Sequence, residues 1–397
     1  MKIEKLKVKN FKVFHNMEIR DFPNLCVFLG ANGSGKTTLF DVFGFLSSAL
    51  HHNVKHALHQ RGGFDEVISR NSTGDIEFEL KFRDTPGSPL VTYELSIGLS
   101  ENKSPIVTKE VLSYRRGSRG RPYRFLDFSR GRGSAIINEA EFAEAKQEFK
   151  DQREEQVLES PDILAIKGLG QFKKFKAIST FRRLLENWFV SNFQIQAAQN
   201  IEETGLSEHL SRNGNNLAQV TEYIYENHRP IFEQILGKMK KRIPGISEVR
   251  ATKTIDGRIV LQFKDGTFKD PFISRYVSDG TIKMFAYLIL LNDPTPHPLL
   301  CVEEPENYLH PELLRELAEE FREYAQQGQV FISTHSPDFV NHLKIEELFW
   351  LYKKDGYTQV QRAKDDKVVQ NLVKEGDALG YLWTQGYLKG SGIKSLI

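Results

Sequence analysis

The sequence predicts an α/β fold with a mixed sheet, an antiparallel β insertion and a helical lobe. The apolar run "NLCVFLG" (24–30) leads into a glycine-rich turn and the helical pattern "KTTLFDVFGFLSSAL" (36–50), a common start of α/β folds. Continuous apolar runs return in "LLCVEE" and "QVFISTH", which is typical of parallel strands covered on both faces. Between these regions, residues 75–134 alternate apolar and polar side chains with a period of two, which indicates an antiparallel meander.

Composition and charge describe a globular chain. Of 397 residues, 40% are hydrophobic and 27% charged, with a net charge of +2, so attraction to nucleic acid would have to come from local patches. Cys26 and Cys301 both lie inside apolar runs, which excludes a disulfide framework. The apolar run 284–291 is far below the roughly 18–20 residues that span a bilayer, and the first residues have no signal-peptide core. We therefore predict a cytoplasmic protein.

The remaining patterns give a coarse order of elements. Residues 1–22 predict two antiparallel strands, 138–158 and 205–243 predict helices, 181–200 predicts a helix running into a strand, and 249–263 predicts strands. We interpret the chain as one discontinuous domain with four segments: 1–74 with the first strands and the glycine-rich turn, 75–135 with the meander, 136–250 with the helical lobe, and 251–397 with the last strands and helices.

The glycine-rich turn matches the phosphate-loop pattern in full, from Gly30 to Thr37. Its glycines let backbone N–H groups surround an anion, and the following helix points its positive dipole end at the same place. Lys36 would reach the β- and γ-phosphates of ATP, and the hydroxyl of Thr37 would bind Mg²⁺. The candidate nucleotide-binding residues are Gly30, Asn32, Gly33, Ser34, Gly35, Lys36, Thr37 and Thr38.

Two adjacent glutamates, Glu303 and Glu304, end the apolar run "LLCV". Neighbouring carboxylates at a strand end repel each other unless a cation neutralises them. In phosphate-loop proteins that cation is Mg²⁺, which an acid at the end of a second apolar strand holds through water. In one large class of these proteins, a glutamate follows this acid and polarises the attacking water. We assign Glu303 to the metal and Glu304 to the water as general base.

Two further sites complete the pattern. Ser278, Asp279 and Gly280 precede an apolar helix, where a serine can cap the helix or help to bind an anion. His335 follows the strand "QVFIST", at the end of a sheet strand where ligands bind in open α/β folds. One β-α-β unit separates it from Glu304, so the two strand ends should be neighbours.

Together these motifs resemble the ABC-type ATPase heads of the RecF, structural-maintenance-of-chromosomes (SMC) and overcoming-lysogenization-defect (OLD) proteins. The matching stretches are "IEKLKVKNFKVF", "GANGSGKTT", "VSDGT", "EEPENYLHP" and "STHSP", in family order and over nearly the whole chain. The likeness is greatest to the OLD-like group. It implies a P-loop NTPase of ABC type that uses ATP and Mg²⁺.

The resemblance also implies a homodimer with ATP between the P-loop of one subunit and the signature of the other. Ser278 would contact the γ-phosphate across that interface, Asn307 would lie along the D-loop, and His335 would sense the same phosphate. For the glutamine that senses Mg²⁺ and the attacking water, the choice is Gln194, with Gln196 and Gln60 as alternatives. Lys12 occupies a position where a basic residue often approaches nucleotide phosphates, although a solvated strand residue is equally compatible with the pattern.

This sequence also departs from the family. OLD nucleases carry a C-terminal Toprim nuclease domain, but the acidic pair Asp365-Asp366 lacks the glycine-rich strand context and the distant glutamate of a two-metal centre. We therefore expect no nuclease site in this chain. The resemblance implies an ATP-hydrolysing switch that controls DNA processing or a separate effector, a nuclease or toxin, in bacterial antiphage defence. The alternative is a scaffold that binds ATP, hydrolyses it slowly or not at all, and holds such an effector.

An arginine-rich segment, residues 113–134, contains seven arginines interleaved with Tyr114, Tyr123, Phe125 and Phe128. Such a segment could follow nucleic-acid phosphates and stack bases, dock an acidic partner, or form a solvated hairpin tip. The candidate DNA-binding residues are Arg115, Arg116, Arg119, Arg121, Arg124, Arg130 and Arg132.

Overall fold

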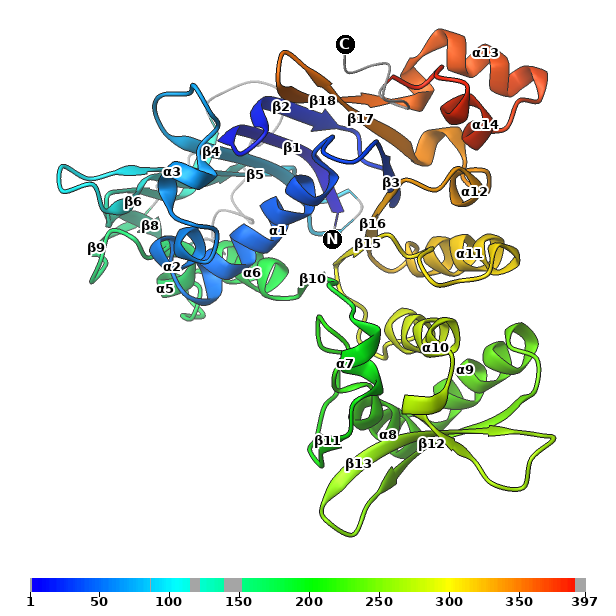
Figure 1. The fold of residues 1–397 in the computed structure, drawn as a ribbon. Coiled ribbons are helices and arrows are strands. Elements are labelled where there is room, and N and C mark those ends of the chain that lie inside the picture. The colour runs from blue at the N-terminus through cyan, green and yellow to red at the C-terminus, as the bar shows by residue number, and fades with distance from the viewer. Residues whose placement is uncertain (1, 86, 115–121, 139–151, 390–397) are drawn as a thin grey trace. The chain divides into compact units, whose positions relative to one another are not determined.

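The computed structural model describes residues 2–85, 87–114, 122–138 and 152–389 (Figure 1). By its internal contacts the chain divides into two compact units. Unit 1 comprises Met1–Trp188, Ile345–Asp377 and Leu382–Ile397, and unit 2 comprises Phe189–Lys344 and Ala378–Tyr381. Within the described ranges, no helix is both long and apolar enough to cross a membrane.

Unit 1 is built on an eight-stranded antiparallel sheet with the order β2-β1-β4-β5-β6-β7-β8-β9. The predicted N-terminal strand pair and the predicted meander are both part of it. Its apolar side chains alternate with polar ones, so one face is buried. The strands are β1 (Lys2–Phe11), β2 (Phe14–Arg20), β4 (Ile76–Arg83), β5 (Val91–Leu99), β6 (Pro105–Tyr114), β7 (Tyr123–Ser129), β8 (Arg132–Ile136) and β9 (Arg153–Val157).

Strand β9 corrects the prediction of a helix over 138–158. Residues 153–157 pair with β8, with Arg153 opposite Ile136 and Val157 opposite Arg132. Their burial alternates between exposed and half-buried, which is the period of a strand at a sheet edge. The many charged residues favoured the helical prediction, but pairing with β8 overrides such local propensity. The rest of the predicted helix, 139–151, lies outside the described residues.

A second group of strands in unit 1 holds the phosphate loop. Strand β3 (Leu25–Leu29) is buried along its whole length and runs parallel to β17 (Leu348–Lys354), which pairs antiparallel with β18 (Tyr357–Arg362). Helix α1 (Lys36–His51) follows β3 and packs on both sheets of the unit. Its Phe40 contacts Phe28 of β3, and its Phe45 stacks on Phe78 of β4 at 5.5 Å between ring centroids. These contacts fix the helix whose N-terminus closes the loop.

A buried carboxylate joins the antiparallel sheet to a short helix, α5 (Ala165–Leu169). Glu110 of β6 accepts hydrogen bonds from the N–H groups of Ala165 and Ile166 and from the hydroxyl of Tyr93. Burial raises the pKa of Glu110 to about 7, although these donors favour the ionised form. Other helices of unit 1 are α2 (Val54–His59), α3 (Phe64–Val67), α6 (Lys176–Glu186) and α13 (Lys367–Glu375), whereas α14 (Leu379–Thr384) has residues in both units.

Unit 2 contains the predicted β-α-β unit. Strand β15 (Leu299–Glu303) runs parallel to β16 (Gln329–Thr334), with Glu303 opposite Ser333, which confirms that the two strand ends are neighbours. Helix α11 (Leu314–Tyr324) connects them, and helix α10 (Asp279–Leu291) precedes β15 (Figure 1). Further elements nearby are β10 (Trp188–Val190), α7 (Ile195–Gln199) and α12 (Pro337–Val340).

The helical lobe of unit 2 is shorter than predicted. The helix expected over 205–243 consists of α8 (Leu217–Asn227) and α9 (Arg229–Arg242), and residues 204–216 are not helical. In that loop, Asn216 accepts from the N–H of Ser211, and the hydroxyl of Ser211 accepts from the N–H of Gly214. Such side-chain bonds compete with helix formation. The strands β11 (Glu202–Glu203), β12 (Ile246–Lys253), β13 (Arg258–Asp265) and β14 (Phe272–Ile273) form the small sheet of the lobe.

Candidate nucleotide-binding and catalytic site

The phosphate loop lies between β3 and α1 in unit 1, as the sequence predicted. Gly33 and Gly35 have φ angles of 76° and 106°, in the left-handed region that L side chains rarely adopt. A Cβ atom on Gly35 would also lie 2.6 Å from the hydroxyl of Thr358. The ammonium group of Lys36 donates to the carbonyl of Gly30 at 2.6 Å. The loop therefore has the backbone conformation that its glycines predicted, with the lysine folded over it.

Thr358, on β18, is a partner of the loop that the sequence analysis missed. Its hydroxyl donates to the carbonyl of Ser34 at 2.7 Å, and its own N–H donates to the carbonyl of Val13. The residue is buried. Because 324 residues separate Thr358 from Ser34, no local pattern indicates this contact.

Lys12 is held against the phosphate-loop helix. Its ammonium group lies 2.6 Å from a carboxylate oxygen of Asp41, and Arg61 binds the other oxygen of the same carboxylate. Asp41 follows Thr37 by one turn of α1, so both residues are on one side of the helix. Lys12 itself has a φ of 50°, a conformation uncommon outside glycine, asparagine and aspartate. Its role toward phosphate stays a prediction.

The acidic strand end of unit 2 brings three predicted residues together. Glu304 is the first residue after β15, and its carboxylate lies 2.9 Å from the ring Nδ1 of His335 and accepts from the amide of Asn307 at 2.9 Å. Its backbone N–H donates to the carbonyl of Ser333 on the neighbouring strand. With a φ of 44°, the Glu304 backbone is strained, and such strain is typical of functional sites. The structure thus orients the Glu304 side chain toward the histidine.

Two buried charged residues support this turn, and neither was identified from the sequence. Glu306 has 8% of its surface exposed, and burial raises the pKa of its carboxyl group. One of its oxygens accepts from the hydroxyl of Thr334, and the other is buried and makes no hydrogen bond with the residues that the structure describes. A carboxylate at this depth is costly unless hydrogen bonds or a nearby cation offset its burial.

Lys283, on α10, is the second of these residues, with only 5% of its surface exposed. Its ammonium group donates to the carbonyls of Glu304 at 3.1 Å and Asn307 at 2.8 Å. Burial lowers the pKa of Lys283 to about 8, while the carboxylates of Glu306 and Glu304 oppose that shift. A sequence signal did exist, because Lys283 is the only charged residue in the run 281–291.

The signature residues begin α10. The hydroxyl of Ser278 accepts from the N–H of Thr281 at 3.3 Å, so Ser278 caps the helix in this structure. A Cβ atom on Gly280 would lie 2.6 Å from the carbonyl of Tyr308, which explains why a glycine is required there. Asp279 accepts from the side chain of Gln199. Capping does not exclude anion binding, because both use the same helix end.

The three candidate glutamines occupy different places. Gln194 is exposed, and its backbone N–H donates to the carbonyl of Asn213 immediately before α7. Gln196 is exposed within α7. Gln60 ends α2 and accepts from the hydroxyl of Ser48. Gln194 thus follows a strand and precedes a helix, as proposed for the sensor glutamine.

The arginine-rich segment is only partly described, because Arg115, Arg116, Arg119 and Arg121 lie outside the described residues. Arg124 forms an ion pair with Asp127, and Arg130 and Arg132 are exposed. The interpretation of Phe125 and Phe128 as base-stacking residues is wrong, because both side chains are buried in the sheet core. Residues three apart lie on opposite faces of a regular strand, but the pairing of β6 with β7 shifts register beside Phe125, between Arg124 and Leu126.

The fold and these motifs define a P-loop ATPase head of the ABC type. The chain belongs to the family described as "AAA domain, putative AbiEii toxin, Type IV TA system", whose model matches residues 25–341. The chain is also similar to DNA replication and repair protein RecF of Lactococcus lactis subsp. cremoris, with 27% identity over 145 residues, covering 34% of this chain and 40% of RecF. RecF of Lactobacillus johnsonii is 25% identical over 140 residues, covering 33% of this chain and 37% of that protein.

Solved structures share the fold. An SMC head bound to the C-winged helix domain of ScpA has a TM-score of 0.56 at 15% identity, covering 91% of this chain and 97% of that chain. An SMC head with an extended coiled coil, bound to the C-terminal domain of ScpA derived from Pyrococcus furiosus, has a TM-score of 0.51 at 13% identity, covering 94% and 99%. The RecF matches span less than half of RecF, so they leave the activity of the whole protein to be tested.

Proposed function

We propose that this protein binds and hydrolyses ATP as a dimeric, Mg²⁺-dependent switch. The observation that carries the proposal is the orientation of Glu304 by His335 and Asn307 at the end of β15, in a chain that also has a complete phosphate loop. A carboxylate that is fixed by two partners and has a strained backbone is suited to act as a general base. His335 would report on the phosphate that leaves.

The residues fit the substrate and the metal. The Ser34 hydroxyl is buried without a hydrogen-bond partner among the described residues, as expected for a loop that binds an anion. Thr37 and Glu303 offer the oxygen donors that Mg²⁺ prefers, and Mg²⁺ would neutralise charge on the β- and γ-phosphates. Lys36 would bind the same phosphates, and Gln194 would help to position the attacking water.

The second part of the proposal is assembly. Ser278, at the start of α10, would complete the site of a second subunit, so that ATP closes a homodimer and hydrolysis opens it. The position of Ser278 at a helix N-terminus supports this, because such an end attracts anions. The dimer would control a separate nuclease or toxin, or DNA processing, in antiphage defence. The toxin–antitoxin description of the family supports control of a toxin or nuclease. The likeness to RecF supports a role in DNA processing.

The test compares wild type with Glu304→Gln in ATP turnover and in molar mass, with and without ATP and Mg²⁺. Loss of a general base lowers kcat by about 10²–10⁴-fold. The variant should also accumulate as an ATP-bound dimer. Glu312→Gln, at an exposed position on the same connection between β15 and β16, is the matched control and should behave as wild type.

Two results would contradict the proposal. Unchanged turnover in Glu304→Gln would remove Glu304 as the base and favour a scaffold that seldom hydrolyses ATP. A wild type and a variant that both stay monomeric with ATP and Mg²⁺ would exclude the dimeric switch. For a switch and for a scaffold alike, copurification with the products of the neighbouring genes would identify the effector.

A further inference from the structure

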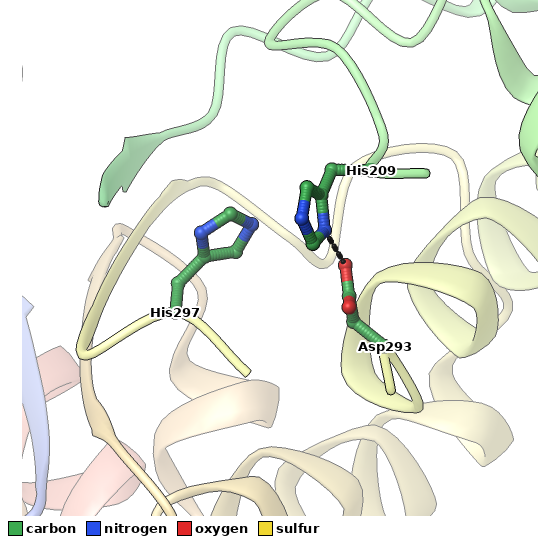
Figure 2. A group of neighbouring side chains, drawn as sticks. All are labelled: His209, Asp293 and His297. Atoms are coloured by element: carbon green, nitrogen blue, oxygen red, sulfur yellow. Dashed lines mark hydrogen bonds and ion pairs between the residues drawn. The ribbon is translucent and has the colours of Figure 1, made fainter. Parts of the chain in front are cut away.

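Three potential metal ligands lie together in unit 2, apart from the acidic strand end described above. His209, Asp293 and His297 each offer one donor atom, and all three atoms lie within 4.8 Å of one another. Figure 2 shows the imidazole of His209 between the carboxylate of Asp293 and the ring of His297. The His209 Nδ1 atom lies 2.8 Å from Oδ2 of Asp293.

Two of the three ligands, Asp293 and His297, are held by residues outside the cluster. The Oδ1 atom of Asp293 accepts a hydrogen bond from the N–H of Thr295 at 2.8 Å, and the Oδ2 atom faces His209. The ring of His297 stacks on Phe189 at 4.9 Å between centroids, and its backbone N–H donates to the hydroxyl of Tyr324 at 2.8 Å. Such outer contacts orient metal ligands in known sites.

The burial of the cluster also indicates a cation. The side chain of Asp293 is only 4% exposed, and a carboxylate at that depth needs a positive partner. His209, with 43% of its side chain exposed, borders solvent and can admit an ion. Two imidazoles and one carboxylate form a donor set for which zinc competes far better than Mg²⁺, since Mg²⁺ prefers oxygen ligands only.

We propose that His209, Asp293 and His297 bind one zinc ion, with water as the fourth ligand. Zinc bonds of about 2.0–2.1 Å in a tetrahedron require ligand atoms about 3.4 Å apart, so the His209–Asp293 distance of 2.8 Å must lengthen, while any distance near the 4.8 Å limit must shorten. The exposed side chain of His209 can supply that movement.

The bound zinc would join two loops of unit 2. His209 lies in the non-helical loop 204–216, whereas Asp293 and His297 lie between α10 and β15. The second loop leads directly into the strand that ends at Glu303. Zinc would therefore clamp the loop 204–216 to the base of the acidic strand.

The competing interpretation is a His209–Asp293 ion pair that needs no metal. A second group of histidines could also bind zinc, and the experiment must distinguish it from the His209 cluster. This group consists of His51, His52, His56 and His59, and the ring centroids of His52 and His56 are 4.2 Å apart. Metal content alone would not distinguish these sites. The variants must therefore address each of them.

The experiment uses the full chain, stripped of metal with a chelator and dialysed. Zinc uptake is measured by calorimetry and by elemental analysis, with Co²⁺ absorption as a report on four-coordinate geometry. The variants are His209→Gln and Asp293→Asn, and the control is the double variant His52→Gln/His56→Gln. Circular dichroism and thermal unfolding show whether each variant is folded.

We expect one zinc per chain in wild type and in the control, with affinity at least 10-fold weaker in His209→Gln and Asp293→Asn. Zinc should raise the Tm of wild type, and excess Mg²⁺ should not displace it. If wild type takes up no zinc at micromolar concentration, or if folded His209→Gln binds it as tightly as wild type, the proposal is wrong. Loss of the ion in the His52→Gln/His56→Gln control alone would also overturn it.

Discussion

The substitution Lys283→Met tests how the turn after β15 is supported. Lys283 donates to the carbonyls of Glu304 and Asn307 from the interior of α10. Methionine keeps most of the side-chain volume but removes both hydrogen bonds and the charge. The turn that directs Glu304 toward His335 would then lose its anchor.

Two opposing free-energy terms set the effect on stability. Each buried carbonyl left without its donor costs about 1–3 kcal/mol, or about 2–6 kcal/mol for both. Against this, the pKa of Lys283 is lowered from 10.5 to about 8, so burying its charge costs about 3 kcal/mol at neutral pH. The terms partly cancel. At pH 7 the free energy of unfolding should therefore fall by no more than about 3 kcal/mol.

The pH dependence has a defined sign. Between pH 8 and 10.5 the unfolded chain binds a proton at Lys283 that the folded chain has lost, so the free energy of unfolding of wild type rises with pH in that window. Lys283→Met lacks this rise. The difference in stability between the two proteins should increase by about 2 kcal/mol from pH 7 to pH 9.5.

Urea unfolding at both pH values measures this difference, and steady-state ATP hydrolysis measures the effect on the turn. We expect kcat to fall at least about 10-fold, because misplacing a catalytic group by about 1 Å has effects of that order. Nucleotide affinity should stay near wild type, since the phosphate loop is formed by other residues. Lys240→Met, at an exposed position on α9, is the control. The reasoning would be refuted if the free energies of unfolding of wild type and Lys283→Met changed with pH in parallel, or if kcat were the same in both proteins.

The remaining predictions concern two contacts of unit 1. Burial raises the pKa of Glu110 from 4.5 to about 7, so the folded chain binds more protons than the unfolded one in that window and wild type loses stability as pH rises through it. Glu110→Gln should flatten this dependence in urea unfolding between pH 5 and 7.5, and a slope equal to that of wild type would contradict the assignment. Thr358→Val removes the hydrogen bond to Ser34 and should weaken binding of a fluorescent ATP analogue about 5-fold, corresponding to about 1 kcal/mol, whereas Thr358→Ser should bind normally. Equal affinity in both variants would show that this contact does not support the loop.

Much of the fold was predictable because the relevant signals are local. The glycines of the phosphate loop are required by their own φ angles, and the apolar run of β3 reflects burial on both faces. The errors also have local causes. The charge-rich run before Val157 favours a helix until pairing with β8 is known, and the loop 204–216 carries a helical pattern that its serine and asparagine side chains interrupt.

The sequence by itself determined the phosphate loop, the parallel pair β15 and β16, and the proximity of Glu304 to His335. These follow from short-range backbone rules and from the single helix that connects the two strands. Only the tertiary structure decided which distant residues support them: Lys283 beneath Glu304, Thr358 beside Ser34, and His209 against Asp293. Such contacts depend on where whole elements pack, and a buried charge or hydroxyl finds its partner across space, so no periodicity or spacing records it.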